Sequence, residues 1–192
     1  MDTFYLEGNE IMQDGRKVIK ICEPGCEKWE DALTRKDEYT WEWTRTIWAE
    51  NNRKSIEEVE MGILLYGPAD FYMIPCVNYA GNSWGEGKEP KGMYRDGKPW
   101  RFAGHRSGVP AGMYGQNADV AAGLFAALDN PVGVSASLTK EAGCLCMTLH
   151  FPEEESPVVY CARDCYEERP YRDNWKIEAD KITLRAYLIL TG

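Results

Sequence analysis

The chain has 192 residues, and its 31 acidic against 22 basic side chains leave a formal net charge of −9. A chain of this length forms one domain by default and buries about 70% of its unfolded surface, so it can hold a core without disulfides or metals. The acidic balance argues against nucleic acids and anionic membranes as partners, and no apolar run approaches the roughly 18 residues of a membrane span.

The N-terminal segment lacks the basic and apolar regions of a secretory signal, so we expect a cytoplasmic protein unless a leader has been removed. The seven cysteines are odd in number, and their spacings match no zinc-ribbon pattern. Because there are only two histidines, free structural thiols are favoured over disulfides or a metal site. The sequence therefore predicts no metal and no cofactor.

Alternating patterns typical of β-strands dominate the first half of the chain. In residues 39–48, Tyr39, Trp41, Trp43, Arg45 and Ile47 fall on one face, and polar side chains fall on the other. Residues 57–66 and 71–79 are apolar runs on either side of a Gly-Pro-Ala-Asp turn, which predicts two inner strands.

Further short strands are predicted in the second half, at 119–128, 132–139, 144–151, 157–162 and 182–190. Turn-forming residues separate them. Residues 26–35 and 55–61 could alternatively be helical, although neither is long or well capped. Many short strands with regular turns predict an all-β protein, with two antiparallel sheets packed as a sandwich.

Residues 78–117 interrupt this pattern. They carry nine of the 18 glycines, six basic against three acidic side chains, and six aromatic rings. We interpret them as a long loop region rich in glycine and aromatic residues. Loops of this length in compact domains are often functional, so binding residues are expected here.

Residues 74–111 also carry a resemblance to a known family. The run Ile74-Pro-Cys-Val-Asn-Tyr-Ala-Gly-Asn-Ser-Trp-Gly-Glu-Gly87 is followed by Glu89-Pro-Lys-Gly-Met93, Asp96-Gly-Lys-Pro-Trp100 and Phe102-Ala-Gly-His-Arg106. This order resembles a segment of large bacterial glycoside-hydrolase-like proteins, and a weaker likeness extends over residues 40–190.

In that family the segment belongs to an N-terminal β-sandwich of the galactose-mutarotase-like, supersandwich kind. An (α/α)-toroid with the catalytic carboxylates follows it. The resemblance implies that residues 1–192 are one sandwich domain excised from a larger protein. Its partners would then be the C-terminal catalytic domain and an oligosaccharide.

Sugars are bound by flat aromatic faces flanked by amides, acids and arginine. Residues of these types lie close together in the sequence, and we take them as candidates for a carbohydrate site or a domain interface: Asn78, Tyr79, Asn82, Trp84, Trp100, His105 and Arg106. Alternatively, Trp84 and Trp100 pack in the core. His150, inside the predicted strand 144–151, is expected to be a hydrogen-bonded structural histidine.

A glycoside hydrolase needs two carboxylates facing the scissile bond. The acids of the loop region and its flank, Glu86, Glu89, Asp96 and Asp119, are better explained as turn or surface residues, so no catalytic residue is predicted. The expected function is a non-catalytic sandwich that supports a glycoside-hydrolase domain. The alternatives are a free-standing carbohydrate-binding module and a mutarotase-like epimerase that would use His105 with Glu86.

Overall fold

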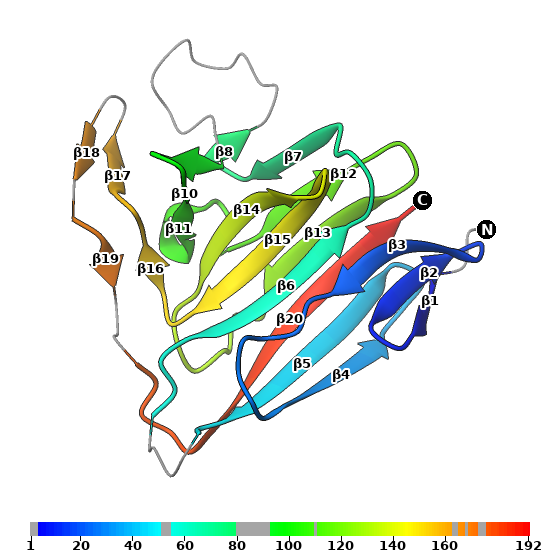
Figure 1. The fold of residues 1–192 in the computed structure, drawn as a ribbon, viewed down its shortest axis with the longest axis horizontal. Helices are drawn as coiled ribbons and strands as arrows, with labels where there is room; N and C mark the ends of the chain where they lie inside the picture. The colour runs from blue at the N-terminus through cyan, green and yellow to red at the C-terminus, as the bar shows by residue number, and fades with distance from the viewer. Residues whose placement is uncertain are drawn as a thin grey trace.

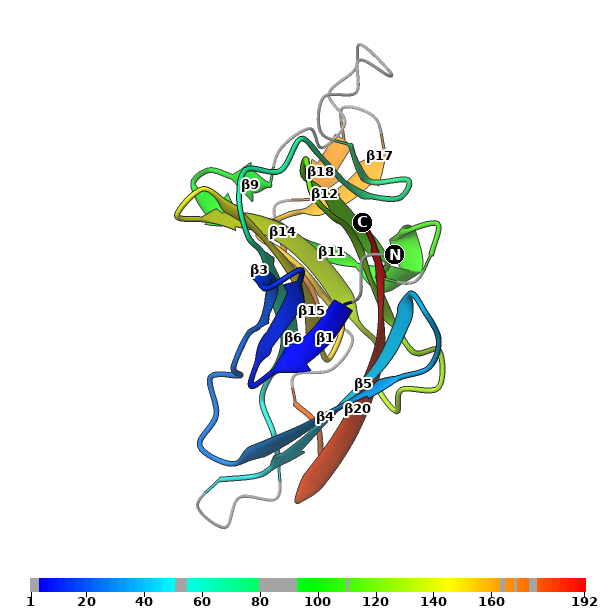
Figure 2. The same ribbon diagram turned by 90° about the vertical axis from the view of Figure 1, so that its right-hand side faces the viewer.

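The computed structural model describes residues 4–50, 55–79, 93–109, 111–162, 165–167, 169–172 and 176–192. Two seven-stranded antiparallel sheets pack face to face (Figures 1 and 2). Sheet A contains, in spatial order, β1 (Phe4–Glu7), β2 (Glu10–Gln13), β3 (Arg16–Ile21), β6 (Val59–Leu65), β15 (Cys144–Phe151), β14 (Ser135–Glu141) and β11 (Arg101–Ala103). Sheet B contains β4 (Trp29–Arg35), β5 (Thr40–Trp48), β20 (Lys181–Thr191), β13 (Ala121–Ala126), β12 (Met113–Gln116), β7 (Phe71–Ile74) and β8 (Asn78–Tyr79).

Smaller elements lie beside the two main sheets. They are the pairs β9 (Tyr94–Arg95) with β10 (Lys98–Pro99), β16 (Glu154–Glu155) with β19 (Tyr171–Arg172), and β17 (Val159–Ala162) with β18 (Cys165–Glu167). A single turn of 3-10 helix, η1 (Gly104–Arg106), follows β11. Within the described part of the chain, no helix has the length and apolar character needed to cross a bilayer. The all-β sandwich predicted from the sequence is confirmed.

For the two longest strands, β5 and β20, the sequence analysis predicted correctly which side chains point into the core. Along β5, Trp41, Trp43, Arg45 and Ile47 are all buried, whereas the residues between them are partly exposed. The buried apolar side chains of β20, which lies beside β5 in sheet B, and of β15 in sheet A belong to the same core between the sheets. Because successive side chains of a strand point to opposite faces, this selection of core residues follows from the sequence alone.

Two regions differ from the sequence analysis. The possible helix at 26–35 is strand β4, which pairs with β5 along its whole length. The described part of the region 78–117 is less a loop than a set of short strands, with β11 in sheet A and β12 in sheet B. Glycine suits β12 because a Cβ at Gly115 would lie 2.4 Å from Leu145 Cδ2 of the opposite sheet. Close packing between the sheets therefore explains this glycine, which had suggested a loop.

Four of the described cysteines, Cys22, Cys26, Cys144 and Cys146, are free thiols. Burial, together with the nearby Cys146, raises the pKa of Cys22 from 9.0 to about 11.

We therefore expect Cys22 to resist alkylation at pH 8, because its thiolate fraction is about a hundredfold smaller than that of an ordinary thiol. A short pulse of iodoacetamide followed by peptide mass spectrometry measures this, with the exposed thiol of Cys76 as internal control. Both thiols should react at similar rates in urea. Equal labelling of the two in the folded protein at pH 8 would contradict the assignment.

Candidate functional site

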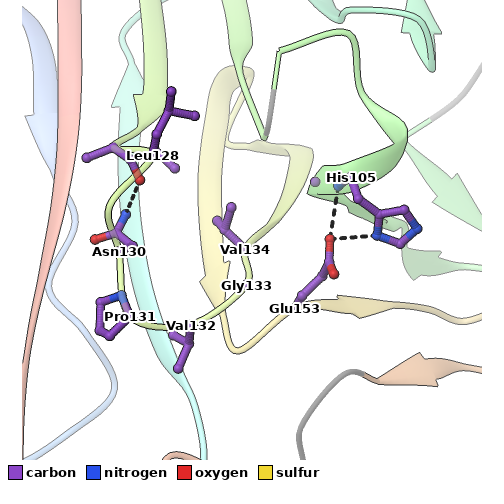
Figure 3. Close-up of a pocket in the computed structure, with 11 residues that line it drawn as sticks. His105, Leu128, Asn130, Pro131, Val132, Gly133, Val134 and Glu153 are labelled. Carbon is purple, nitrogen blue, oxygen red and sulfur yellow. Dashed lines mark hydrogen bonds and ion pairs between the residues drawn. The ribbon is translucent and has the colours of Figure 1, made fainter.

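A pocket of about 470 Å³ lies at one end of the sandwich. One wall is the turn between β13 and β14, which contributes Ala126, Ala127, Leu128, Asn130, Pro131, Val132, Gly133 and Val134. Gly104, His105 and Glu153 form the other side (Figure 3). Its volume falls in the range of about 300–1,000 Å³ that is usual for small-molecule sites, and most of the turn residues are apolar.

The turn that forms the apolar wall is held by one asparagine. Asn130 Nδ2 donates to the carbonyl oxygens of Ala127 and Arg185, both at 2.9 Å, and Asn130 Oδ1 accepts from the backbone N–H of Arg185 at 2.8 Å. The side chains of Asp129 and Arg185 also form an ion pair. The wall is thus attached to β20, which lies beside β13 in sheet B, and the amide of Asn130 has a structural role.

The opposite side carries a histidine joined to a carboxylate. Glu153 Oε1 accepts the backbone N–H of His105 at 3.0 Å and lies 2.9 Å from His105 Nδ1 (Figure 3). Since a carboxylate faces Nδ1, that nitrogen carries the proton, and Nε2 of the neutral ring is an acceptor. The side chain of Glu153 is 10% exposed and that of His105 is 53% exposed. The ring of Tyr171 meets the imidazole edge-on, with centroids 5.6 Å apart.

The helical turn that presents His105 is fixed by its first residue, Gly104, and by Ser107, which follows it. The N–H of Gly104 donates to Val134 O at 2.8 Å, which ties η1 to the pocket wall. Ser107 Oγ donates to Gly104 O at 2.9 Å and accepts from the N–H of Ala111 at 3.0 Å. The position of His105 is therefore determined by backbone contacts on both sides of the turn.

Three consecutive acids after β15 anchor this corner of the molecule. Glu153 holds His105, Glu155 Oε2 lies 2.6 Å from Arg106 Nε, and Glu154 Oε2 lies 2.6 Å from Arg172 Nε. In the sequence these acids lie between the predicted strands 144–151 and 157–162, and so among the residues interpreted as turns. Their signal was the placement of three acids directly after an apolar strand, but nothing in the sequence identified their partners.

The structure brings together two of the predicted site residues, His105 and Arg106, each with an acid of the same run. Trp100 is 3% exposed and stacks on Phe102 with centroids 4.9 Å apart, so it lies in the core, as the alternative interpretation had it. Asn78 and Tyr79 form β8 at the edge of sheet B. Asn82 and Trp84 lie outside the described residues, as does Glu86, the proposed acidic partner of His105.

The chemistry available in the pocket is that of one acid–base unit. His105 and Glu153 are the titratable side chains among the described residues that line it, and they are bonded to each other. Mutarotation and glycoside hydrolysis each need two separate groups at the substrate. Among the described residues, the pocket offers one such unit, and the second ring nitrogen of His105 can form a hydrogen bond with a hydroxyl group.

No protein-family model matches this sequence, and a search of curated proteins finds no match.

Proposed function

We propose that this chain is a non-catalytic β-sandwich domain that binds a saccharide and serves a glycoside-hydrolase-like protein. The observation that carries the proposal is the pocket beside His105. It offers an apolar wall for the C–H face of a sugar and, at the rim, an imidazole Nε2 that can accept a hydroxyl hydrogen bond. Sequence resemblance to the N-terminal sandwich of such proteins supports the same conclusion, with the chemistry assigned to a C-terminal catalytic domain.

A mutarotase-like activity is the second candidate, because His105 is hydrogen-bonded to a carboxylate at a pocket. Polarimetry on freshly dissolved α-glucose and α-galactose separates the two functions. We expect the equilibration rate to be that of the buffer. A protein-dependent rate that is lost in His105→Ala would favour the epimerase instead.

The binding proposal is tested by screening a glycan panel and then measuring affinity for the best saccharide by calorimetry. We expect His105→Ala to weaken binding about tenfold, since one hydrogen bond to the ligand is lost. Val132→Trp should abolish binding by filling the pocket. Asp119→Asn is the matched control, because Asp119 lies at the opposite end of β13 and is exposed.

Absence of binding to any saccharide, or equal affinity in all three variants, would overturn the proposed site. Trp84→Ala separates this proposal from a free-standing carbohydrate-binding module. Such a module would use the Trp84 ring to bind the saccharide, so this variant would weaken its binding. Trp100→Ala is a poor test of binding, because it removes a buried ring that stacks on Phe102.

A further inference from the structure

A second group of polar side chains lies on the face of sheet A that points away from the core. It consists of Glu58, which precedes β6, Glu60 within β6, and His150, which is paired with Glu60 across the neighbouring strand β15. Nδ1 of His150 lies 3.1 Å from Glu60 Oε1 and 3.4 Å from Glu58 Oε1. One oxygen of each carboxylate and the ring nitrogen all lie within 4.8 Å of one another.

The imidazole of this group is held in place from its far side. Nε2 of His150 lies 2.7 Å from Ser137 Oγ, on strand β14. His150 is 4% exposed and Ser137 is 3% exposed, so the ring cannot turn freely. When Nε2–H donates to Ser137, the lone pair of Nδ1 points at the two carboxylates. Fixing the second ring nitrogen in this way is typical of histidines that bind metals.

With the proton on Nε2, Nδ1 and the two carboxylate oxygens are three acceptor atoms that face one another, and a cation between them would satisfy all three. A proton on Nδ1 can be donated well to only one of the two carboxylates. The two separations, 3.1 and 3.4 Å, also exceed the usual charge-assisted hydrogen bond of about 2.7–2.9 Å. For metal–ligand bonds of about 2.1 Å, neighbouring ligand atoms are about 3.0–3.4 Å apart in octahedral or tetrahedral geometry. The two separations between His150 Nδ1 and the carboxylate oxygens therefore match the spacing of ligands around one metal ion.

The charges in the group are also compatible with a cation. The guanidinium of Arg101, which contacts both carboxylates, favours their ionised form. Arg101 Nη1 lies 2.5 Å from Glu58 Oε1, and its Nη2 lies 3.5 Å from Glu60 Oε1. With a neutral imidazole, the charges of Glu58, Glu60 and Arg101 sum to about −1. Each carboxylate oxygen has two lone pairs, so Arg101 can support the ligands from outside while the other lone pair binds the ion.

We propose that Glu58, Glu60 and His150 form a binding site for one divalent transition-metal ion. A nitrogen with two carboxylate oxygens suits ions such as Zn²⁺, Mn²⁺ or Co²⁺, and three protein ligands leave at least one position for water or a bound molecule. The carboxylate side chains are 42% and 44% exposed, which gives an ion access from solvent. The sequence analysis predicted no metal from the cysteine spacings and the two histidines, and it could not identify this group because Glu58 and His150 are 92 positions apart. The site is independent of the proposed saccharide pocket.

The test uses the whole chain, freed of metal by a chelator and dialysed. Mn²⁺ is titrated with electron paramagnetic resonance as the readout, and Co²⁺ with visible absorption. We expect one ion per chain and a Co²⁺ spectrum without thiolate charge-transfer bands, because the ligands are nitrogen and oxygen. Glu60→Gln and His150→Gln should each weaken Mn²⁺ binding at least about tenfold. Glu57→Gln, an exposed neighbour outside the group, should leave it unchanged.

Failure to bind Mn²⁺ or Co²⁺ at about 1 mM would overturn the proposal and leave the group as an ion-pair network around a proton. Thiolate bands, or equal affinity in Glu60→Gln and the unchanged chain, would overturn it as well. Glu58→Gln changes a third proposed ligand and should keep the fold, since this side chain lies at the surface. Circular dichroism of each variant shows whether the fold is kept.

Discussion

Replacement of Asp31 by alanine is expected to lower the free energy of unfolding by about 3–5 kcal/mol, although the residue lies at the edge of the molecule. The reason is its partner Arg45, whose side chain is completely buried. Arg45 Nε lies 2.8 Å from Asp31 Oδ1, and its Nη2 lies 2.6 Å from Asp31 Oδ2. Without this carboxylate, a buried guanidinium would remain without a counter-charge.

Arg45 also joins the two sheets. From β5 in sheet B, its Nη1 donates to Glu60 O at 2.5 Å and its Nη2 to Cys22 O at 2.7 Å, both on the side of sheet A. The guanidinium carbon lies 4.7 Å from the ring centroid of Trp43 and 5.3 Å from that of Trp29. These contacts keep the charge in the core and prevent it from moving to solvent when Asp31 is removed.

Urea unfolding at neutral pH measures the effect of Asp31→Ala. Lys36→Ala is the matched control, since it breaks an exposed ion pair with Glu42 and should cost at most about 1 kcal/mol. In the double variant Asp31→Ala/Arg45→Met no uncompensated charge is left, so part of the stability should return. A loss in Asp31→Ala no larger than that in Lys36→Ala would contradict the buried ion pair.

Replacement of Gly104 by alanine is expected to cost about 1–3 kcal/mol and to weaken binding at the pocket. A Cβ at this position would lie 2.4 Å from Val134 O and 3.2 Å from the nitrogen of Ala111. Both are backbone atoms, so they cannot swing aside as a flexible side chain would. The turn η1 must instead move away from β14, and it carries His105 with it.

Thermal or urea unfolding and saccharide affinity are the two measurements for Gly104→Ala. Gly25→Ala provides the control, because no atom lies within 4 Å of the added Cβ and the change should stay within about 0.5 kcal/mol. If Gly104→Ala is as stable as Gly25→Ala, η1 is not held against the pocket wall in the way described.

Much of the fold could be predicted from local pattern. The alternation in β5 and β20 identified both the strands and the side chains that enter the core, including the unusual Arg45. Where the local signal was ambiguous, as at 26–35, the sequence analysis allowed a helix. Trp29–Arg35 form strand β4 because they pair with β5. Whether a segment has a partner strand depends on the rest of the fold and not on the segment's own sequence.

The candidate sites were only partly predictable. His105 and Arg106 were singled out for their chemistry, but their acidic partners were not. Trp100 had the right chemistry for sugar stacking, yet it lies in the core. Residue type indicates what a side chain can do, whereas its exposure depends on what packs against it.

By itself, the sequence determined the class of fold and the faces of the main strands, because the two-residue period of a strand is a local property of the backbone. Only the tertiary structure decided which charges meet. His105 and Glu153 are 48 positions apart, and His150 and Glu58 are 92 apart. The order of strands in each sheet brings them together, and in sheet A that order places β6 beside β15. Such neighbours depend on the packing of the whole chain, so no local pattern records them.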